Sequence, residues 1–456
     1  LNRKWMVAMP VNTTKILAEF AITAKLNDLL AELITPVIAD CFGCIIAGSN
    51  SQVAIRSYKS FKKFGSGDST LFGTNKLLNL QSATVCNSVA GHAWDFDDYE
   101  APGNTHPTVV ILPAMLSASH LQKTSGTELL IAYAVGVEVI MQLGQAITLE
   151  HYARGFHSTA TLGAIGAAAA VSRLLHLSKE QTSNALAIAV SQAIGYTAQF
   201  GSNAKSIQTG FAARAGLEAA VLAESGATGN LDIIESDSGF FALLGQHDKD
   251  RIDLIENKIG NKWALLEHGV YLKPWPVCSY THRAITAALD IRKRLKNQLD
   301  QITEVRVVMP DFHYAILPFK IPQNHNEALF SLPACLAKIL IDGTLTLKDY
   351  ENSFWEKSEI QQLIKKVFVK TEPARNLSLN FDPEQPDHLS IKLEGGELIE
   401  SKCAFPLGSP QNPMNLDQLS GKFQSITGYS AERFQNLLKW PQTSDVLKFF
   451  REASDH

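Results

Sequence analysis

Helical periodicity of apolar residues dominates this chain from about residue 14 to residue 265, and it limits the fold more than any other feature. Residues 127–148 (TELLIAYAVGVEVIMQLGQAIT) are apolar at i, i+3, i+4 and i+7, and residues 159–177 are crowded with glycine and alanine. Helices that are apolar on nearly every side belong inside a protein, and small residues let neighbouring helices approach closely. We therefore predict a large layer of packed helices, including one over 179–200 that is capped by Ser178.

The pattern changes after about residue 270. Residues 302–310 and 365–373 alternate with a period of two, and 389–402 forms two alternating runs around a Gly-Gly pair, which predicts a hairpin. A helix over 327–343 lies between these strands, and helical patterns return near the C-terminus. We predict a mostly α fold, in which a large helical domain is built from N- and C-terminal segments and a smaller α+β domain is inserted. The predicted segments are 14–268 and 408–456 for the helical domain and 269–407 for the α+β domain.

Length and charge exclude several classes of function. The 456 residues are too many for one ordinary core, so two domains are expected. A net charge of −4, from 41 basic and 45 acidic residues, gives no reason to expect binding to nucleic acid or to an anionic membrane surface. No uninterrupted apolar stretch reaches the roughly 18–20 residues that span a bilayer, since 129–143 is shorter and contains Glu138. Residues 1–10 are interpreted as a tail and not as a signal peptide.

The six cysteines are too sparse for a disulfide framework and fit a reducing cytosol, so a cytoplasmic protein is expected. Cys41 and Cys44 form a Cys-x-x-Cys pair, which is a candidate redox or metal pair. No second such pair stands near it, and both cysteines lie in an apolar helical segment that Pro36 is predicted to open. We therefore interpret both as buried structural thiols.

Four stretches place ionisable residues in otherwise apolar or small-residue surroundings. They are 91–108 (GHAWDFDDYEAPGNTHPT) with three aspartates and two histidines, 154–163 with His157, 200–216 with Lys205, and 271–282 with Lys273, Cys278 and His282. The fourth stretch lies where the two sequence patterns meet, and domain junctions are common places for small-molecule clefts.

Taken singly, each of these residues has a purely structural interpretation. Asp97 and Asp98 can cap the helix that follows them, because acids stabilise helix starts. His157 can be a satisfied polar residue, Lys205 a surface charge and Cys278 a packing residue. The sequence contains no HExxH, GxGxxG, P-loop or GxSxG motif, so it does not predict a metalloprotease, nucleotide or serine-hydrolase site.

Together, however, the stretches match a known family. The matching segments, in order over about residues 14–445, are GHAWDFDDYEAPGNTHPTVVILPA, GFHSTATLGAIGAAAA, KSIQTGFAARAGLEAA, KPWPVCSYTH, NEALFSLPACLAKILIDG and GSPQNPMNLDQLSGKF. By these segments the chain resembles the MmgE/PrpD family, whose members include 2-methylcitrate dehydratase, cis-aconitate decarboxylase and iminodisuccinate epimerase. The resemblance implies a helical body, an inserted lid domain, a site in the cleft between them and, commonly, a homodimer.

The resemblance also assigns site residues by motif. Those implied to be catalytic are Asp95, His106, His157 and Lys273, and those implied to bind substrate are Lys205, Tyr99, Cys278, His282 and, as a looser match, Tyr314. Two positions depart from the decarboxylase pattern. Tyr99 stands where decarboxylase-like members have threonine, and Cys278 matches dehydratase-like and epimerase-like members, where decarboxylases carry histidine.

Family substrates are small polycarboxylates, and this sets the expected chemistry. Lys205 and Lys273 are expected to bind substrate carboxylates. His106 and His157 are expected to transfer protons, with Asp95 orienting one imidazole, and no metal or organic cofactor is expected. The leading hypothesis is a 2-methylcitrate dehydratase-like hydro-lyase of propionate metabolism. The alternatives are an iminodisuccinate epimerase-like isomerase, a cis-aconitate decarboxylase-like carboxy-lyase and a catalytically silent binding protein.

Overall fold

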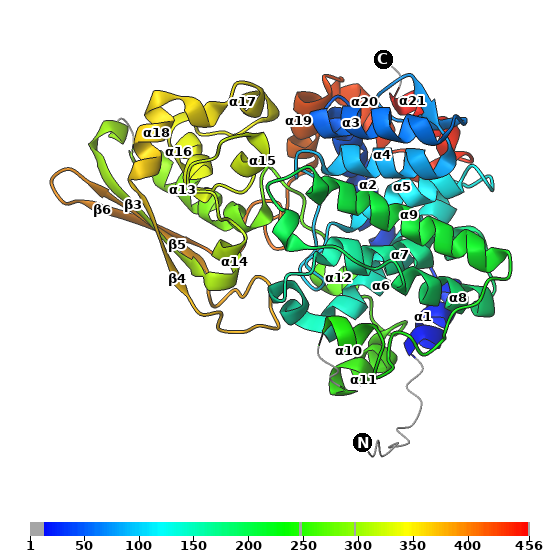
Figure 1. Ribbon diagram of the computed structural model, residues 1–456. Coiled ribbons are helices and arrows are strands. Elements are labelled where there is room, and N and C mark those ends of the chain that lie inside the picture. Colours follow the sequence, from blue (N-terminus) through cyan, green and yellow to red (C-terminus); the bar gives the residue numbers. More distant parts are fainter. Residues whose placement is uncertain (1–12, 246–248, 296–297, 455–456) are drawn as a thin grey trace.

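A computed structural model describes residues 13–245, 249–295 and 298–454, and it is mostly helical, with 59% helix and 10% strand. Figure 1 shows two parts side by side: a larger body of packed helices, and a smaller part in which helices flank a sheet. The predicted class, mostly α, is confirmed. The predicted N-terminal tail and the last two residues of segment 408–456 lie outside the described residues.

The body contains helices from both ends of the chain. From the N-terminal side these are α1 (Thr13–Thr23), α2 (Asp28–Gly48), α3 (Gln52–Phe61), α4 (Leu80–His92), α5 (Pro107–Ala118), α6 (Gly126–Ala153), α7 (Ser158–Leu174), α8 (Lys179–Val190), α9 (Ala204–Glu224), α10 (Phe240–Leu244), α11 (Lys249–Lys258) and α12 (Ala264–His268). From the C-terminal side they are α19 (Leu416–Thr427), α20 (Ala431–Leu437) and α21 (Val446–Ser454). A small hairpin of β1 (Ser69–Leu71) and β2 (Lys76–Leu78) precedes α4.

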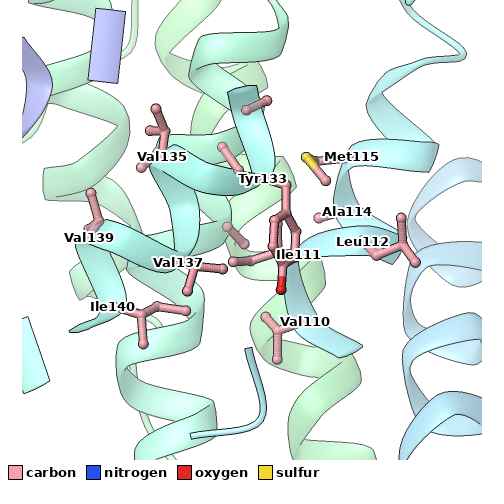
Figure 2. Close-up of a cluster of buried hydrophobic side chains, with 14 of the residues drawn as sticks. Val110, Ile111, Leu112, Ala114, Met115, Tyr133, Val135, Val137, Val139 and Ile140 are labelled. Carbon is pink, nitrogen blue, oxygen red and sulfur yellow. The ribbon is translucent and has the colours of Figure 1, made fainter. Parts of the chain in front are cut away.

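The body packs closely around α6, α7 and α9. Side chains of α5 and α6, such as Ile111, are fully buried in this core (Figure 2). Gly166 of α7 faces α6, where an added Cβ would lie 2.4 Å from Ile140 Cγ1. Gly216 of α9 faces α7, where an added Cβ would lie 2.4 Å from Ala167 Cβ. The glycine- and alanine-rich segments therefore allow the close helix contacts that the sequence predicts.

Two body helices, α2 and α6, are long and apolar enough to cross a membrane by length and composition. In α6, 94% of the apolar window is buried inside the protein, and in α2 the share is 67%. Neither helix is an uninterrupted apolar stretch, because α2 contains Asp40 and α6 contains Glu138. Core helices of soluble proteins pass the same test, and burial within the body accounts for the apolar composition of both.

The start of α2 differs from the prediction. The Asn27 side chain accepts the N–H of Leu30 at 2.9 Å and caps the helix, so Pro36 lies inside α2 and not in its first turn. Cys41 and Cys44, which α2 carries, are buried free thiols. Burial raises the pKa of both well above the ordinary thiol value, which leaves them unreactive and supports their structural interpretation.

The end of α8 also differs. α8 begins after the predicted cap, Ser178, but it ends at Val190 instead of continuing to residue 200. The chain then turns back towards α7, and the Gly195 carbonyl accepts the backbone N–H of His157 at 2.9 Å. An added Cβ on Gly195 would lie 2.5 Å from Ala160 Cβ, so this approach requires glycine. Ala193 and Gly195 of this loop are buried, but Ile194 and Tyr196 are half exposed, so the apolar pattern past Val190 does not mark a buried helix face.

The C-terminal helices contact α2. Trp440 Nε1 donates to the Thr35 carbonyl at 3.1 Å. Lys422 of α19 forms a buried ion pair with Asp40 of α2 at 2.7 Å and donates to the Phe96 carbonyl at 2.9 Å. The C-terminal segment thus supports both α2 and the loop that carries the first polar stretch. The exact domain boundaries stay a prediction.

The smaller part, called the lid below, combines a sheet with helices. Its described elements are α13 (His282–Leu295), β3 (Ile302–Pro310), α14 (Asp311–Ala315), α15 (His325–Ala328), α16 (Leu332–Asp342), α17 (Leu347–Glu351), α18 (Ser358–Lys365), β4 (Val367–Glu372), β5 (Asp387–Leu393) and β6 (Leu398–Cys403). The strand order is β4-β3-β5-β6, with β3 and β4 parallel and the other pairs antiparallel.

The predicted strands of the lid are present, and so is the hairpin. It turns at Gly395 and Gly396, whose φ angles of 90° and 91° glycine adopts without strain. The predicted helix over 327–343 is divided into α15 and α16, and Gly343 ends α16 with φ 77°. Lid residues dominate a hydrophobic cluster that is separate from the cluster of the body.

Candidate active site

The loop between α4 and α5 carries the first polar stretch. α4 ends at His92, and α5 begins at Pro107. The first residue of a helix donates no backbone hydrogen bond within the helix, so a proline there costs none. Glu100 holds the loop together, because its carboxylate accepts hydrogen bonds from the Gly103 N–H at 2.7 Å and from the Thr105 hydroxyl at 2.6 Å. This compact loop directs its three aspartates into the interior, where all three are buried.

Asp95 lies at the centre of the site. Its backbone is left-handed, with φ 49°, which is uncommon for a residue with a side chain. Lys205 Nζ donates to its Oδ2 at 2.8 Å, and Lys273 Nζ donates to its Oδ1 and, at 2.8 Å, to its carbonyl oxygen. Burial alone raises the pKa of the Asp95 carboxyl, but the two ammonium groups outweigh burial and hold that pKa well below its usual range.

His92 connects a carboxylate to one of these ammonium groups. Its Nδ1 lies 2.8 and 2.9 Å from the two carboxylate oxygens of Asp97, and its Nε2 lies 2.9 Å from Lys205 Nζ. An ammonium group can only donate, so Nε2 accepts and the proton of the neutral ring is on Nδ1. Burial lowers the pKa of His92, and Lys205 adds to this effect against the opposing charge of Asp97. Sequence reasoning missed His92 as a site residue, although it lies three residues before Asp95.

His106 uses one ring nitrogen for a backbone hydrogen bond, and its other ring nitrogen lies near Asp95. Its Nδ1 donates to the Asp98 carbonyl at 2.9 Å, and its Nε2 lies 3.6 Å from Asp95 Oδ1. Burial lowers the pKa of His106 to about 4; Asp97 opposes this shift and Lys273 adds to it. The ring is therefore neutral at neutral pH in the free protein, with Nε2 as a proton acceptor.

His157 lies at the start of α7 and approaches the same region. Its ring meets Phe200 edge-on, with 5.0 Å between ring centroids. Its Nδ1 is buried and has no hydrogen-bond partner among the described residues. Burial lowers the pKa of His157 well below its ordinary value, and Lys205 adds to the shift. His157 thus lines the site as a neutral, buried imidazole with one ring nitrogen that bonds to no described residue.

These side chains meet at a small, partly open cavity. Its lining residues are Asp95, Asn104, His106, Tyr152, His157, Thr159, Phe200, Lys205, Cys278, Ser279, Tyr280 and Phe330. Asp95, His106, His157, Lys205 and Cys278 are thus brought together from all four polar stretches, and their roles stay predictions. A larger groove, lined by Arg251, Glu267 and His268 among others, contains none of the predicted site residues.

Aromatic rings form part of the cavity wall. Phe200 from the loop before α9 stacks on Phe330 from the lid, with 5.4 Å between ring centroids. Lys205 Nζ lies 5.2 Å from the centroid of each of these rings, a cation–π arrangement. The ammonium group of Lys205 therefore lies between a carboxylate, an imidazole and two aromatic faces.

Four predicted site residues do not line this cavity, and two of them lie behind Asp95. Lys273 is fully buried, and both of its described hydrogen bonds go to Asp95. Tyr99 stacks on Tyr271 with 4.7 Å between ring centroids, and its ring lies 5.8 Å from Lys273 Nζ. The backbone pairing of Tyr99 with Tyr271 turns the Tyr99 ring into the core between body and lid. Lys273 thus supports Asp95 instead of facing the cavity.

The other two lie in the lid and the segment that enters it. His282 is fully buried, with Nε2 3.2 Å from the Val277 carbonyl. Tyr314 of α14 is partly buried against the lid core. Tyr280, which sequence reasoning missed, lines the cavity where Tyr314 was expected, and its hydroxyl donates to Asn380 Oδ1 at 3.0 Å. The substrate-binding roles expected for His282 and Tyr314 are not supported by this geometry.

The capping interpretation of Asp97 and Asp98 is wrong. The residue that precedes α5 is His106, and no side chain caps this helix start. Asp97 pairs with His92 instead, and Asp98 Oδ2 accepts the Thr108 hydroxyl at 2.7 Å. Burial, reinforced by the negative charge of Asp97, raises the pKa of Asp98 to about 8. Asp98 is therefore a protonated, uncharged group at neutral pH.

Two models of one protein family match most of the chain. The MmgE/PrpD N-terminal domain matches residues 15–253, and the MmgE/PrpD C-terminal domain matches residues 275–439. The chain belongs to the MmgE/PrpD family. It is 30% identical to the cis-aconitate decarboxylase of Mus musculus over 402 residues, which cover 85% of this chain and 80% of that protein.

Two further relatives of this MmgE/PrpD protein carry the same name. The cis-aconitate decarboxylase of Homo sapiens is 27% identical over 442 residues, which cover 94% of this chain and 89% of that protein. The cis-aconitate decarboxylase of Aspergillus terreus is 25% identical over 421 residues, which cover 86% of this chain and 84% of that protein. These names favour the decarboxylase alternative over the leading dehydratase hypothesis.

Four side chains of the MmgE/PrpD site have a spacing that a metal ion could use, because one ligand atom of each lies within 4.8 Å of the others. They are His92, Asp95, Asp97 and His106. The donor set indicates a different use. Asp95 is already paired with two ammonium groups, and Lys205 also occupies His92 Nε2. A metal ion would have to displace both lysines, so we assign the positive charge of the site to them. That no metal takes part stays a prediction.

Proposed function

We propose that this protein is a cofactor-independent lyase that acts on a small polycarboxylate, and that its reaction is the decarboxylation of cis-aconitate or a close analogue. The observation that carries the proposal is the convergence of His106, His157 and Lys205 on one cavity with an aromatic wall. The ammonium and imidazole groups support the substrate class, and the names of the relatives support the reaction.

Lys205 is the group that we assign to a substrate carboxylate. An ammonium group has three N–H donors, and Lys205 uses one for Asp95 and one for His92. The third donor is available at the cavity wall. A charge-assisted hydrogen bond in such a buried place is stronger than one in water. Lys273, by contrast, holds Asp95 from behind and does not face the cavity.

Loss of CO2 breaks a C–C bond, and its electron pair must be accommodated. In cis-aconitate, a carboxylate lies on the carbon next to the alkene, so this pair can form a new C=C bond while the old alkene carbon takes a proton. The protein must therefore supply one proton to carbon and stabilise negative charge in the transition state. Lys205 is placed for the second task, and His106 and His157 are placed for the first.

The proton state of the histidines fits binding of an anion. In the free protein His106 is neutral, because burial lowers its pKa to about 4. A substrate with several carboxylates brings negative charge next to the ring, which raises the pKa and favours the imidazolium form. The imidazolium Nε2–H then faces the cavity and can protonate the substrate carbon.

The aromatic wall favours decarboxylation in particular. A carboxylate placed against Phe200 and Phe330 exchanges water for apolar faces, which destabilises the charged group relative to neutral CO2. Because Asp95, His157 and Lys205 are buried, the site also protects a carbanion-like intermediate from side reactions.

A 2-methylcitrate dehydratase-like hydro-lyase is the second candidate, favoured by one observation. Cys278 lines the cavity, and the family resemblance gives cysteine at this position to dehydratase-like and epimerase-like members. Neutral His106 would then act as the base that removes a C–H proton, and His157 would protonate the leaving hydroxyl.

The two reactions separate in one experiment. The purified protein is incubated with cis-aconitate, 2-methylcitrate, citrate and iminodisuccinate, and products are followed by proton NMR. CO2 loss from cis-aconitate supports the proposal, and alkene formation from 2-methylcitrate would replace it with the second candidate. Inversion of iminodisuccinate would indicate an epimerase, and no reaction with any of these would indicate a binding protein. His106→Asn and His157→Asn are the matched inactive controls.

The cellular setting is part of the same proposal. We infer from the sparse cysteines that the protein acts in the cytoplasm, and from the family resemblance that it is a homodimer with the helical body and the lid as its two domains. Sedimentation equilibrium of the purified protein tests the dimer, and limited proteolysis tests the boundaries near residues 269 and 407.

A further inference from the structure

We propose that His92 is a positioning residue that holds the Lys205 ammonium group in its substrate-binding orientation. The inference rests on the proposed function, because it takes Lys205 as the partner of a substrate carboxylate. His92 does not line the cavity, so it acts through Lys205 and not by contact with substrate.

The geometry is a chain of three groups from three parts of the body. Asp97 lies in the loop after α4, His92 ends α4, and Lys205 lies in the first turn of α9. α4 and α9 pack so closely that an added Cβ on Gly210 would lie 2.8 Å from the Val85 carbonyl oxygen. The backbones of both helices are thereby fixed, and the His92–Lys205 contact of 2.9 Å joins two rigid elements.

The hydrogen bonds among Asp97, His92 and Lys205 all run in one direction, from Lys205 to Asp97. Ionised Asp97 accepts the Nδ1 proton of His92, which leaves Nε2 with a lone pair that faces Lys205. The Lys205 ammonium group then has one acceptor in His92 and one in Asp95, with the Phe200 ring beside it. A lysine side chain loses much rotational freedom when it is held in one orientation, and these contacts supply that order before substrate arrives.

The opposite tautomer would have the opposite effect. With the proton on Nε2, His92 would present an N–H to the N–H groups of Lys205, and the two donors would repel. Asp97 therefore selects the tautomer that Lys205 needs, in the way that a buried aspartate orients a histidine in other enzymes. A histidine that only filled space in the core would have no such link to Lys205.

A double-variant binding experiment tests the link. The probe is propane-1,2,3-tricarboxylate, a saturated tricarboxylate that has no alkene to react, and its dissociation constant is measured by calorimetry. We expect His92→Gln to weaken binding about tenfold, because a glutamine amide is flexible and, unlike the neutral ring, is not fixed by Asp97 with its acceptor towards Lys205. Lys205→Met is expected to weaken binding further, and adding His92→Gln to Lys205→Met is expected to change nothing more.

His151→Gln is the matched control. His151 is also fully buried, with both ring nitrogens bonded, to the Leu244 carbonyl and to the Thr161 hydroxyl, each at 2.7 Å. It does not line the cavity. We expect this variant to lose stability as His92→Gln does, but to bind the probe like the wild type.

Asp97→Asn provides a second variant that leaves the imidazole in place. An asparagine amide can donate to Nδ1, which moves the ring proton to Nε2, and binding is then expected to weaken about tenfold. This variant answers the question if His92→Gln does not fold. Asp97 also lies 3.3 Å from His106 Nδ1, so this variant could change turnover through His106. Binding of the probe is therefore measured instead of turnover.

The outcomes distinguish the two proposals. Equal weakening by His92→Gln in the wild-type and Lys205→Met backgrounds would overturn the positioning role. Unchanged binding in both His92→Gln and Asp97→Asn would overturn it as well. If the wild type neither binds this tricarboxylate nor converts a polycarboxylate, the proposed function fails and this inference fails with it.

Discussion

Replacing Lys273 with methionine tests whether a buried ion pair holds the site together. The Lys273 side chain is fully buried, and its ammonium group donates to the carboxylate and the carbonyl of Asp95. Methionine has a similar length without the charge, so the variant leaves the buried carboxylate with Lys205 as its remaining cation. The Asp95 carbonyl oxygen, whose residue has a φ of 49°, also loses the hydrogen bond from Lys273.

The expected effect follows from burial. Removing one partner of a buried ion pair costs about 3–5 kcal/mol, and because Lys205 remains we expect the lower end of this range. Unfolding entropy is about 2.1 cal/mol/K per residue, which for 456 residues gives about 1 kcal/mol/K. A loss of about 3 kcal/mol therefore lowers the melting temperature by about 3 °C when the chain unfolds as a whole.

Scanning calorimetry at neutral pH measures this shift, with Lys338→Met as the control. Lys338 is also nearly buried, but its partners Asp342 and Asp349 are 37% and 17% exposed. Solvent compensates these carboxylates when the lysine is lost, so we expect a cost of about 1 kcal/mol or less. A melting temperature of Lys273→Met within about 1 °C of the control would refute the assignment of Lys273 as the buried support of Asp95.

Three further predictions concern pH and packing. The pKa of His106 is about 4 in the free protein, so its imidazolium form becomes about tenfold rarer with each pH unit above that value. If this imidazolium delivers the proton, kcat/KM for cis-aconitate should fall about tenfold per pH unit from about pH 7 to pH 9. A level pH profile contradicts this acid role. The folded-state pKa of Asp98 is raised to about 8, so the protonated carboxyl contributes stability that is complete below about pH 4 and is lost as the pH rises towards 8. Asp98→Asn should therefore gain melting temperature relative to the wild type between about pH 5 and pH 8, and a constant difference would show that Asp98 is already ionised. Gly166→Ala should destabilise the protein by about 1–3 kcal/mol, because the added Cβ would lie 2.4 Å from Ile140 of α6. The control Gly421→Ala in α19, where no atom lies within 4 Å of the added Cβ, should be neutral or stabilising. Equal midpoints of the two variants in chemical denaturation would show that α6 and α7 can separate at no cost.

Local chemistry explains which elements could be predicted. The Ser178 cap is formed by its side chain and that of Gln181, three residues later, so both signals lie in one short segment. The hairpin at Gly395 likewise depends on backbone freedom that glycine has in any context. The end of α8 could not be predicted, because it is set by the contact of Gly195 with α7, which is distant in the sequence.

The site shows the same division. The motifs predicted that Asp95, His106, His157, Lys205 and Cys278 share one site, and the cavity brings them together. Motif matching could not tell a residue that faces a cavity from one that supports it. Distances make that distinction for the other residues that the motifs marked, Lys273, His282 and Tyr314 among them.

The sequence by itself determined the helical class of the body, the strands of the lid and the residue types that the chemistry uses, because periodicity, caps and turns act within a few neighbouring residues. Only the tertiary structure decided that His92 orients Lys205, that Lys273 holds Asp95 and that Tyr280 reaches the cavity. Those relations depend on how α4, α9 and the lid pack against one another. A difference of a few ångströms in that packing separates a ligand-binding group from a buried support.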